Sequence, residues 1–432
     1  MRASTRTPQR EASLVDNAIL TALARGVTQF EPLLAALPGV YPSVALDALH
    51  RLVSQGKVPL DIWVQAVRHV SQKRLRGAKT CHRMAMPIPH PLDYDWRFSK
   101  AATQALLAQC LDLTRPRDMV ALLGTPSVLQ AAVAGRVLRQ WVLLDTNPLV
   151  TARLAHAAPD AQVLHWDVRQ DPLPDLVAAL VILDPPWYED YMRAFLWAAC
   201  QLCALGGYLL VSVPPAGTRP GMVQEWARTL AWSRQLGLTL LREEVAALPY
   251  TTPPFERNAL HAEGLYMISE DWRRGNLAVF VRTQLAHVPR PQPVDDAAWA
   301  EEVLLGMRVR IRPQPAGGFQ DPTLKSLVPG DVLPSVSRRD PRRRFADVWT
   351  SGNRIFACPG RHVLRQIVTA VAANRSPAEA VAVYLQRPLH PEEKRLVTRA
   401  AYQLLRIACR EQHEYMLFGE GLAHDEFAHQ SS

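Results

Sequence analysis

Cysteine is scarce in this sequence, with six residues in 432. That number is too low for a disulfide scaffold and is typical of a reducing compartment, so we expect a cytoplasmic protein. No apolar run reaches the about 20 residues that a membrane-spanning helix needs, and the polar, basic residues 1–10 do not lead into the apolar segment of a secretion signal. A glycine-rich phosphate loop and a Gly-x-Ser-x-Gly elbow are also missing, so nothing supports nucleotide hydrolysis or a serine hydrolase.

The spacing of cysteine and histidine does not indicate a metal site. Cys200 and Cys203 fall inside an expected apolar helix, and two further ligands at a suitable spacing are not evident. Residues 81–82 and 358–362 each hold a Cys and a His, but cysteines in a core are more typical than a site split in this way. We therefore predict no metal ion.

Basic residues exceed acidic ones. Lys and Arg number 49 against 40 Asp and Glu, which gives a net charge of +9. Residues 1–100 hold 14 Lys and Arg against 7 Asp and Glu, and residues 338–344 hold five arginines. Excess positive charge attracts phosphate backbones, so nucleic acid is the expected partner. The alternative is a basic enzyme whose arginines are merely solvated.

Two proline clusters divide the chain. Residues 86–91 and 288–293 alternate proline with other residues, and such stretches form stiff, extended spacers. They predict domains at 1–84, 85–283 and 284–432.

The first of these domains is expected to be a winged helix-turn-helix. Apolar spacing predicts helices over 14–24, 29–37 and 44–54, and residues 57–64 follow as an expected strand. Such a module contacts DNA or docks a protein partner, and the sequence leaves both open.

The middle domain alternates strands and helices, which predicts an α/β fold with a mostly parallel, doubly wound sheet. Ligands of such sheets bind beyond the carboxyl ends of the strands. Four expected strands end at small or acidic residues: Gly124, Asp145, Asp167 and Asp184.

The sharpest motif is Leu-Asp-Pro-Pro-Trp-Tyr at residues 183–188. The two prolines remove backbone donors and fix the turn, so carbonyl oxygens are presented as acceptors. Asp184 and the carbonyl of Pro185 would each accept a hydrogen bond from an NH2 group on a flat ring. Trp187 or Tyr188 would stack on that ring. Catalysis of this kind depends on positioning rather than on a strong base.

Asp-Pro-Pro-Trp after an apolar strand resembles the fourth motif of SAM-dependent amino-methyltransferases, which modify adenine N6 or cytosine N4 in DNA and RNA. The Trp form is most similar to the eukaryotic messenger-RNA N6-adenosine methyltransferases. The resemblance covers residues 85–283 and implies a Rossmann-like class I methyltransferase fold that uses S-adenosyl-L-methionine. It also implies the catalytic set, which is Asp184, Pro185, Pro186 and Trp187.

The resemblance implies a cofactor site as well. Gly124 stands where the family has a glycine-rich turn beside the methionine moiety, with one glycine in place of two or three. Asp145 stands where the family keeps an acid for the ribose hydroxyls, and a carboxylate can accept both hydrogen bonds. Asp167 stands where the family contacts the adenine amine, and Trp166 would flank that ring. Gly124 precedes Asp184, whereas the messenger-RNA enzymes have the reverse order of motifs.

Two aromatic segments adjoin the expected site. Trp96 or Phe98 would line the cofactor pocket or pack in the core. Residues 250–256 would form a lid over the target pocket or an inert turn.

The last third, 284–432, is expected to be an α+β accessory region for target recognition or assembly. Helices are expected at 376–386 and 391–411, and the second would pack on its own domain or on a second copy in a homodimer. The candidate substrate contacts have basic, amide or aromatic side chains: Tyr188, Arg338, Arg339, Trp349, Asn353 and Arg354.

These observations favour a SAM-dependent N-methyltransferase that acts on adenine N6 of DNA or RNA. Two alternatives stay open. Aminopropyltransferases that act on polyamines share this fold, and some carry a winged helix before it. A non-catalytic methyltransferase-fold module that binds nucleic acid or a partner would also fit a chain with a single glycine in its cofactor loop.

Overall fold

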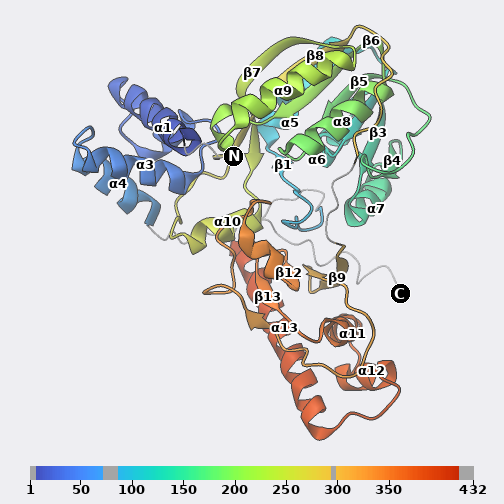
Figure 1. Ribbon diagram of the computed structural model, residues 1–432. Coiled ribbons are helices and arrows are strands. Elements are labelled where there is room, and N and C mark those ends of the chain that lie inside the picture. The colour runs from blue at the N-terminus through green and yellow to red at the C-terminus, as the bar shows by residue number, and fades with distance from the viewer. Residues whose placement is uncertain (1–5, 72–85, 293–297, 418–432) are drawn as a thin grey trace. The chain divides into compact units, whose positions relative to one another are not determined.

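The computed structural model describes residues 6–71, 86–292 and 298–417. The chain forms two compact units (Figure 1). The first contains residues 1–73, 96–252 and 265–294, and the second contains 74–95, 253–264 and 295–432.

The first unit is built on an eight-stranded sheet in the order β1-β7-β8-β6-β5-β2-β3-β4. The strands from β4 to β6 are parallel, and β8 runs antiparallel to both β6 and β7. The strand order runs outward from β2 in both directions and most neighbours are parallel, so the expected α/β fold is confirmed. The bounds are β1 Arg97–Phe98, β2 Met119–Leu123, β3 Gln140–Asp145, β4 Gln162–His165, β5 Ala178–Leu183, β6 Cys203–Val213, β7 Leu238–Thr251 and β8 Arg274–Arg282.

Helices cover both faces of this sheet, because the crossovers on the two sides of β2 run in opposite directions. The central strands are continuous apolar runs, and residues 120–123 of β2 and 180–183 of β5 are buried. The helices are α5 Lys100–Leu113, α6 Pro126–Ala134 and α7 Pro148–Ala157 on one side, and α8 Glu189–Leu202 and α9 Met222–Gln235 on the other.

Over residues 6–71 the N-terminal segment consists of helices joined by short turns, without a strand. Its helices are α1 Arg6–Ala24, α2 Phe30–Ala35, α3 Pro42–Ser54 and α4 Leu60–Ser71. The strand expected at 57–64 is therefore wrong, since Trp63, Ala66 and Val70 follow a helical spacing and turn toward α2 and α3. The described part of this segment holds no wing, so a winged helix is not confirmed.

These N-terminal helices pack on two loops of the sheet region. Gly217 is in the 3-10 turn η1 Ala216–Thr218, which follows β6. It lies so close to the turn between α2 and α3 that a Cβ added to it would be 2.7 Å from the carbonyl oxygen of Pro38. Tyr41 meets Trp272 edge to face at 5.5 Å, in the loop before β8. The helices thus support the loops that follow β6 and precede β8.

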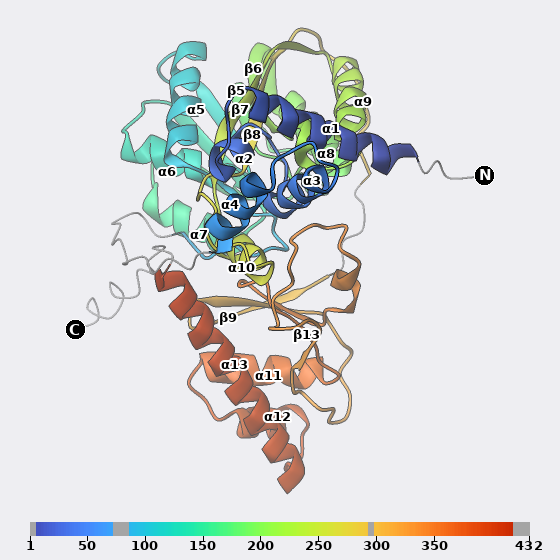
Figure 2. The same ribbon diagram turned by 90° about the vertical axis from the view of Figure 1, so that its left-hand side faces the viewer.

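The second unit is an α+β structure with its own core. Its antiparallel sheet has the order β11-β13-β12-β10-β9, and the long helix α13 packs against α11 and α12 (Figure 2). The bounds are β9 Ala300–Leu304, β10 Met307–Ile311, β11 Lys325–Ser326, β12 Val348–Thr350, β13 Ile355–Ala357, α10 Pro254–Ala262, η2 Pro341–Phe345, α11 Arg361–Ala372, α12 Pro377–Tyr384 and α13 Pro391–Leu417.

The first proline cluster is not a solvated spacer. Ile88 and His90 are buried within the second unit, where His90 bonds to the backbone of Leu92 and Trp349. The second unit also takes α10, which the chain inserts between β7 and β8. The compact units therefore do not follow the three sequence ranges marked by the prolines. No helix within the described ranges is both long and apolar enough to cross a membrane.

Candidate active site

The carboxyl ends of β2, β3, β4 and β5 bring four of the expected residues to one edge of the sheet. The strand ladder continues into them: Gly124 N donates to the carbonyl of Leu144, Trp166 N to that of Asp145, and Asp184 N to that of Leu123. Neighbouring strands lie about 4.8 Å apart, so these residues form one continuous rim. This is the edge at which doubly wound sheets bind ligands.

Gly124 makes the turn from β2 into α6. Its φ of +63° is a left-handed value that favours glycine. Thr125, which follows, is 1% exposed, and its hydroxyl has no hydrogen-bond partner among the described residues. An unsatisfied buried hydroxyl is costly unless a ligand or water completes it. Gly124 and Thr125 therefore form a cradle that fits a polar ligand.

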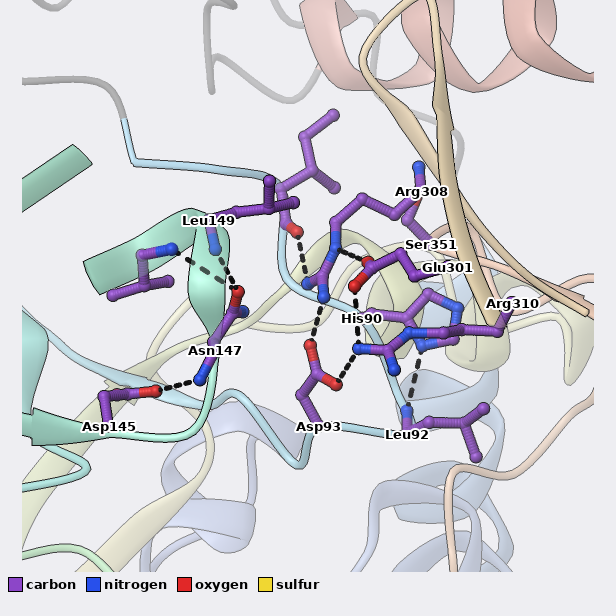
Figure 3. A network of polar contacts seen from close by, with 12 residues as sticks. His90, Leu92, Asp93, Asp145, Asn147, Leu149, Glu301, Arg308, Arg310 and Ser351 are labelled. Atoms are coloured by element: carbon purple, nitrogen blue, oxygen red, sulfur yellow. Dashed lines mark hydrogen bonds and ion pairs between the residues drawn. The ribbon is translucent and has the colours of Figure 1, made fainter. Parts of the chain in front are cut away.

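Asp145 ends β3 and remains partly exposed. Its Oδ1 accepts a hydrogen bond of 2.8 Å from the backbone N of Asn147, whose own side chain caps α7 by accepting from the backbone N of Leu149 and Val150 (Figure 3). The hydrogen bond from Asn147 holds the Asp145 carboxylate at the rim.

Asp167 and Trp166 are engaged with their own loop. Both oxygens of Asp167 pair with the guanidinium of Arg169, at 3.2 and 3.1 Å, and the residue is 9% exposed. The indole nitrogen of Trp166 donates to the carbonyl of Pro172 at 2.8 Å. These contacts order the loop that follows β4, and both carboxylate oxygens of Asp167 already accept hydrogen bonds from Arg169.

Asp184 lies at the end of β5 and is joined to two residues of other strands. Tyr250 of β7 donates its hydroxyl to Oδ1 of Asp184 at 2.6 Å. Ser212 of β6 lies 2.5 Å from the same hydroxyl, and the indole nitrogen of Trp187 donates to Ser212 Oγ at 3.4 Å. The first and last residues of the Asp-Pro-Pro-Trp motif are thus linked through the sheet.

The environment of Tyr250 keeps its phenol protonated. The residue is 2% exposed, and its ring lies 5.0 Å from that of Phe98 and 5.7 Å from that of Trp187. Burial, followed by the charge of Asp184 and the hydrogen bond to it, raises the pKa of Tyr250 well above 10.0. Tyr250 is therefore a constant hydrogen-bond donor to Asp184 rather than part of a lid.

The two prolines differ in what their carbonyl oxygens do. The oxygen of Pro186 accepts from the backbone N of Tyr188 at 2.7 Å. The oxygen of Pro185 has no hydrogen-bond partner within the part of the chain that the structure describes. The Pro185 carbonyl is thus an open acceptor next in the sequence to the Asp184 carboxylate.

Trp187 is 7% exposed, and its neighbourhood is filled by protein. The guanidinium carbon of Arg273 lies 4.7 Å from the centroid of Trp187 and 4.3 Å from that of Trp96, so the cation bridges the two rings. Tyr188 is half-buried, with the guanidinium of Arg219 at 5.3 Å. Of the two aromatics expected to stack on a substrate, Tyr188 has the more accessible ring.

Three expected substrate contacts are internal to the second unit, which corrects their assignment. Trp349 and Asn353 are fully buried and bonded to each other at 3.0 Å. Arg354 is 1% exposed and pairs with Glu411 and Glu414. These polar side chains stabilise a core, which sequence alone could not distinguish from a surface cluster. Arg338 is half-buried and Arg339 is exposed.

Three residues of the site were missed from the sequence: Thr125, Ser212 and Arg273. Ser212 carried a usable signal, because it is the single hydroxyl in the otherwise apolar end of β6, residues 209–213. Arg273 carried none, since nothing in its sequence context indicates a partner. The described residues contain no group of three or more His, Cys, Asp or Glu side chains that could hold a metal ion.

Comparison with known proteins gives matches in structure only. No family model matches the chain, and no curated protein matches its sequence. Among solved structures, a branched-chain polyamine synthase from Thermus thermophilus, in complex with N4-aminopropylspermidine and 5'-methylthioadenosine, is 16% identical with a TM-score of 0.49 over 65% of this chain and 91% of that chain.

Two methyltransferases are similar over a smaller part of the chain. A TehB-like SAM-dependent methyltransferase from Corynebacterium glutamicum is 11% identical, with a TM-score of 0.30 over 43% of this chain and 89% of that chain. An N-methyltransferase from Bradyrhizobium japonicum, in complex with S-adenosyl-L-homocysteine, is 14% identical, with a TM-score of 0.29 over 42% and 86%.

Proposed function

We propose that this protein is a SAM-dependent N-methyltransferase that acts on an exocyclic amine, with adenine N6 of DNA or RNA as the target. The observation that carries the proposal is the pair of acceptors at the end of β5, the carboxylate of Asp184 and the unpartnered carbonyl of Pro185. The main chain of Asp184 lies beside Gly124, since a Cβ added to Gly124 would be 3.6 Å from the backbone carbonyl oxygen of Asp184.

The rim of the sheet fits S-adenosyl-L-methionine. The turn at Gly124 and the buried hydroxyl of Thr125 suit the methionine moiety, at the beginning of α6. Asp145 suits the two ribose hydroxyls, because a carboxylate accepts from both. The loop at Trp166 and Asp167 would flank the adenine. When bound, the cofactor supplies an electrophilic methyl group on a sulfonium.

The chain's own groups would orient the nucleophile. Asp184 and the Pro185 carbonyl each accept one N–H of the substrate NH2, which turns the nitrogen lone pair away from them. The nitrogen lone pair would form the new N–C bond as the C–S bond breaks, with the C–S bonding electrons staying on sulfur, and the proton would leave after the nitrogen has become cationic. Positioning supplies most of the rate, as expected for a site without a strong base.

A nucleic-acid partner fits the basic loop of the second unit. Arg339 and Arg344 are exposed, and Arg344 lies 4.6 Å over the ring of Phe345, which is 54% exposed. Exposed guanidinium groups beside an aromatic ring suit phosphates and unstacked bases. On a duplex the target base would have to leave the stack, at a cost of a few kcal/mol.

The test is transfer of labelled methyl from S-adenosyl-L-methionine to mixed DNA and RNA, with digestion to nucleosides. We expect label in N6-methyladenine with the wild type, and a loss of about 100-fold or more in Asp184→Ala. Asp160→Asn, at an exposed acid in the same unit, is the matched control. Equal incorporation by wild type and Asp184→Ala would overturn the role of Asp184.

Two further arms of this assay separate the alternatives. Decarboxylated S-adenosylmethionine with spermidine tests aminopropyl transfer, which the cation of Arg273 near the site disfavours for a polycationic substrate. Calorimetric titration with S-adenosyl-L-methionine tests the non-catalytic module, which would show no binding. A gel-shift salt series tests the partner, since only a phosphate backbone gives a steep loss of affinity with salt.

A further inference from the structure

We infer that Trp187 is a positioning residue for Asp184. A chain of hydrogen bonds through Ser212 and Tyr250 joins the two ends of the Asp-Pro-Pro-Trp motif. The role of the tryptophan is thus to donate its indole N–H, rather than to stack on a substrate. Only the kinetic consequence of this chain rests on the proposed function.

The direction of the chain follows from the chemistry of its members. An indole N–H can only donate, so Ser212 Oγ accepts from Trp187. The single proton of the Tyr250 hydroxyl goes to Asp184, so the Ser212 proton goes to Tyr250. Every donor therefore points toward the carboxylate, and hydrogen bonds aligned in this way strengthen one another.

Because its members are buried, this chain of hydrogen bonds is a fixed part of the site. Ser212 is 1% exposed, Tyr250 is 2% exposed and Trp187 is 7% exposed. Water does not compete well for such groups, so each position depends on its neighbour. With Oδ1 held by Tyr250, rotation of the Asp184 carboxylate is restricted.

This series of hydrogen bonds explains why the motif has tryptophan at position 187. Ser212 lies on β6, next to β5 in the sheet, and Gly275 of β8 lets the indole approach, since a Cβ there would meet Trp187 Cζ2 and Ser212 Oγ at 3.0 Å each. Phenylalanine at 187 would preserve an aromatic ring but leave the oxygen of Ser212 without its donor.

The kinetic test is a double-mutant cycle with Trp187→Phe and Ser212→Ala, with Ser212→Thr as the rescue. We expect each single variant to lower kcat about 10- to 100-fold with little change in KM, as outer-shell partners do elsewhere. The double variant should be no worse than the poorer single variant, and Ser212→Thr should recover most of kcat. Ser233→Ala removes an equally buried hydroxyl that bonds to the carbonyl of Leu230, and should leave kcat unchanged.

The opposite pattern would overturn the inference. If Trp187 stacked on the substrate, Trp187→Phe would change mainly KM, and its effect would multiply with that of Ser212→Ala. A full kcat in Ser212→Ala would be equally decisive. Circular dichroism and the Tm of each variant show whether the fold is retained.

A second measurement separates failure of this inference from failure of the proposed function. The indole N–H resonance of Trp187, assigned by its loss in Trp187→Phe, should shift in Ser212→Ala and return toward its wild-type position in Ser212→Thr. This holds whether or not the protein methylates any substrate. An indole resonance that does not move in Ser212→Ala would refute the chain directly.

Discussion

The hydroxyl of Tyr250 lies 2.6 Å from Oδ1 of Asp184, although β8 and β6 separate their strands in the sheet. The contact is possible because both residues are at strand ends, where Ser212 of β6 fills the space between them. Side chains from three strands thus converge on one carboxylate.

This contact predicts that the protein loses stability at alkaline pH. Because the pKa of Tyr250 is raised above 10.0 in the folded state, the folded protein holds this proton more tightly than the unfolded chain. Its contribution is complete below pH 10 and is lost as the pH rises from there toward the folded-state pKa, at up to about 1.4 kcal/mol per pH unit. Urea unfolding should show this slope in the wild type and a smaller one in Tyr250→Phe.

Tyr402→Phe is the control for that experiment, since Tyr402 is 62% exposed. Its pH dependence should match that of the wild type. A Tyr250→Phe variant with the same slope as the wild type would contradict a raised pKa.

His90, in the second unit, predicts that the protein also loses stability at acid pH. Its Nδ1 accepts from the backbone N of Leu92 and its Nε2 donates to the carbonyl of Trp349, so the neutral ring is fully bonded. Burial, with the charges of Arg308 and Arg310, lowers the pKa of His90 well below 6.5. Its contribution to stability is present above pH 6.5 and is lost as the pH falls toward the folded-state pKa.

The measurement is the free energy of unfolding between pH 7.5 and 5. The wild type should lose up to about 1.4 kcal/mol per pH unit from this group, whereas His90→Gln should show a flatter dependence. His156→Gln, at an exposed histidine, should behave as the wild type. Equal slopes in all three would rule out a neutral buried His90.

Arg354 should act on stability rather than on substrate affinity. It is buried between Glu411 and Glu414, and Glu411 also accepts from Thr350 and Ser351. Arg354→Met leaves a buried carboxylate without its cation and should cost about 3–5 kcal/mol of unfolding free energy. Arg354→Met with Glu411→Gln should cost clearly less, and Arg339→Met, at an exposed arginine, should cost almost nothing. A full loss of nucleic-acid affinity at unchanged stability in Arg354→Met would return this residue to the substrate site.

Gly124 should be needed for cofactor binding as well as for the left-handed backbone conformation at this turn. Gly124→Ala places a side chain at a φ of +63°, which costs about 1–2 kcal/mol. Gly206→Ala is the matched control, because Gly206 has a φ of +81° with open space around it. We expect similar losses of stability but a weaker affinity for S-adenosyl-L-methionine in Gly124→Ala alone. Equal affinities by calorimetry would place the cofactor elsewhere.

The sheet and its rim were predictable because their determinants are local. Each central strand is an uninterrupted apolar run that ends at a distinctive residue, as at Gly124, Asp145 and Asp184. Residues 57–64 were assigned wrongly because a short apolar run satisfies strand and helix periodicity alike, and the helix extends to Ser71.

The side-chain contacts between strands were not predictable, because they depend on tertiary packing. The bond from Tyr250 to Asp184 joins residues far apart in sequence, and the burial of Trp349 is set by strands that surround it. A proline-rich stretch such as 86–91 has the composition of a linker whether or not a core encloses it.

The insertion of α10 between β7 and β8 limits how the protein can be divided. Among the described residues the chain passes between the units after residues 95, 252 and 264, close to Trp96 and Tyr250. A fragment cut at the second proline cluster would retain α10 while losing the partners of Asn258, which bonds to Gly352 and Glu414. To obtain the first unit alone, two internal segments would have to be excised and replaced by two short artificial joins, in addition to a new stop codon.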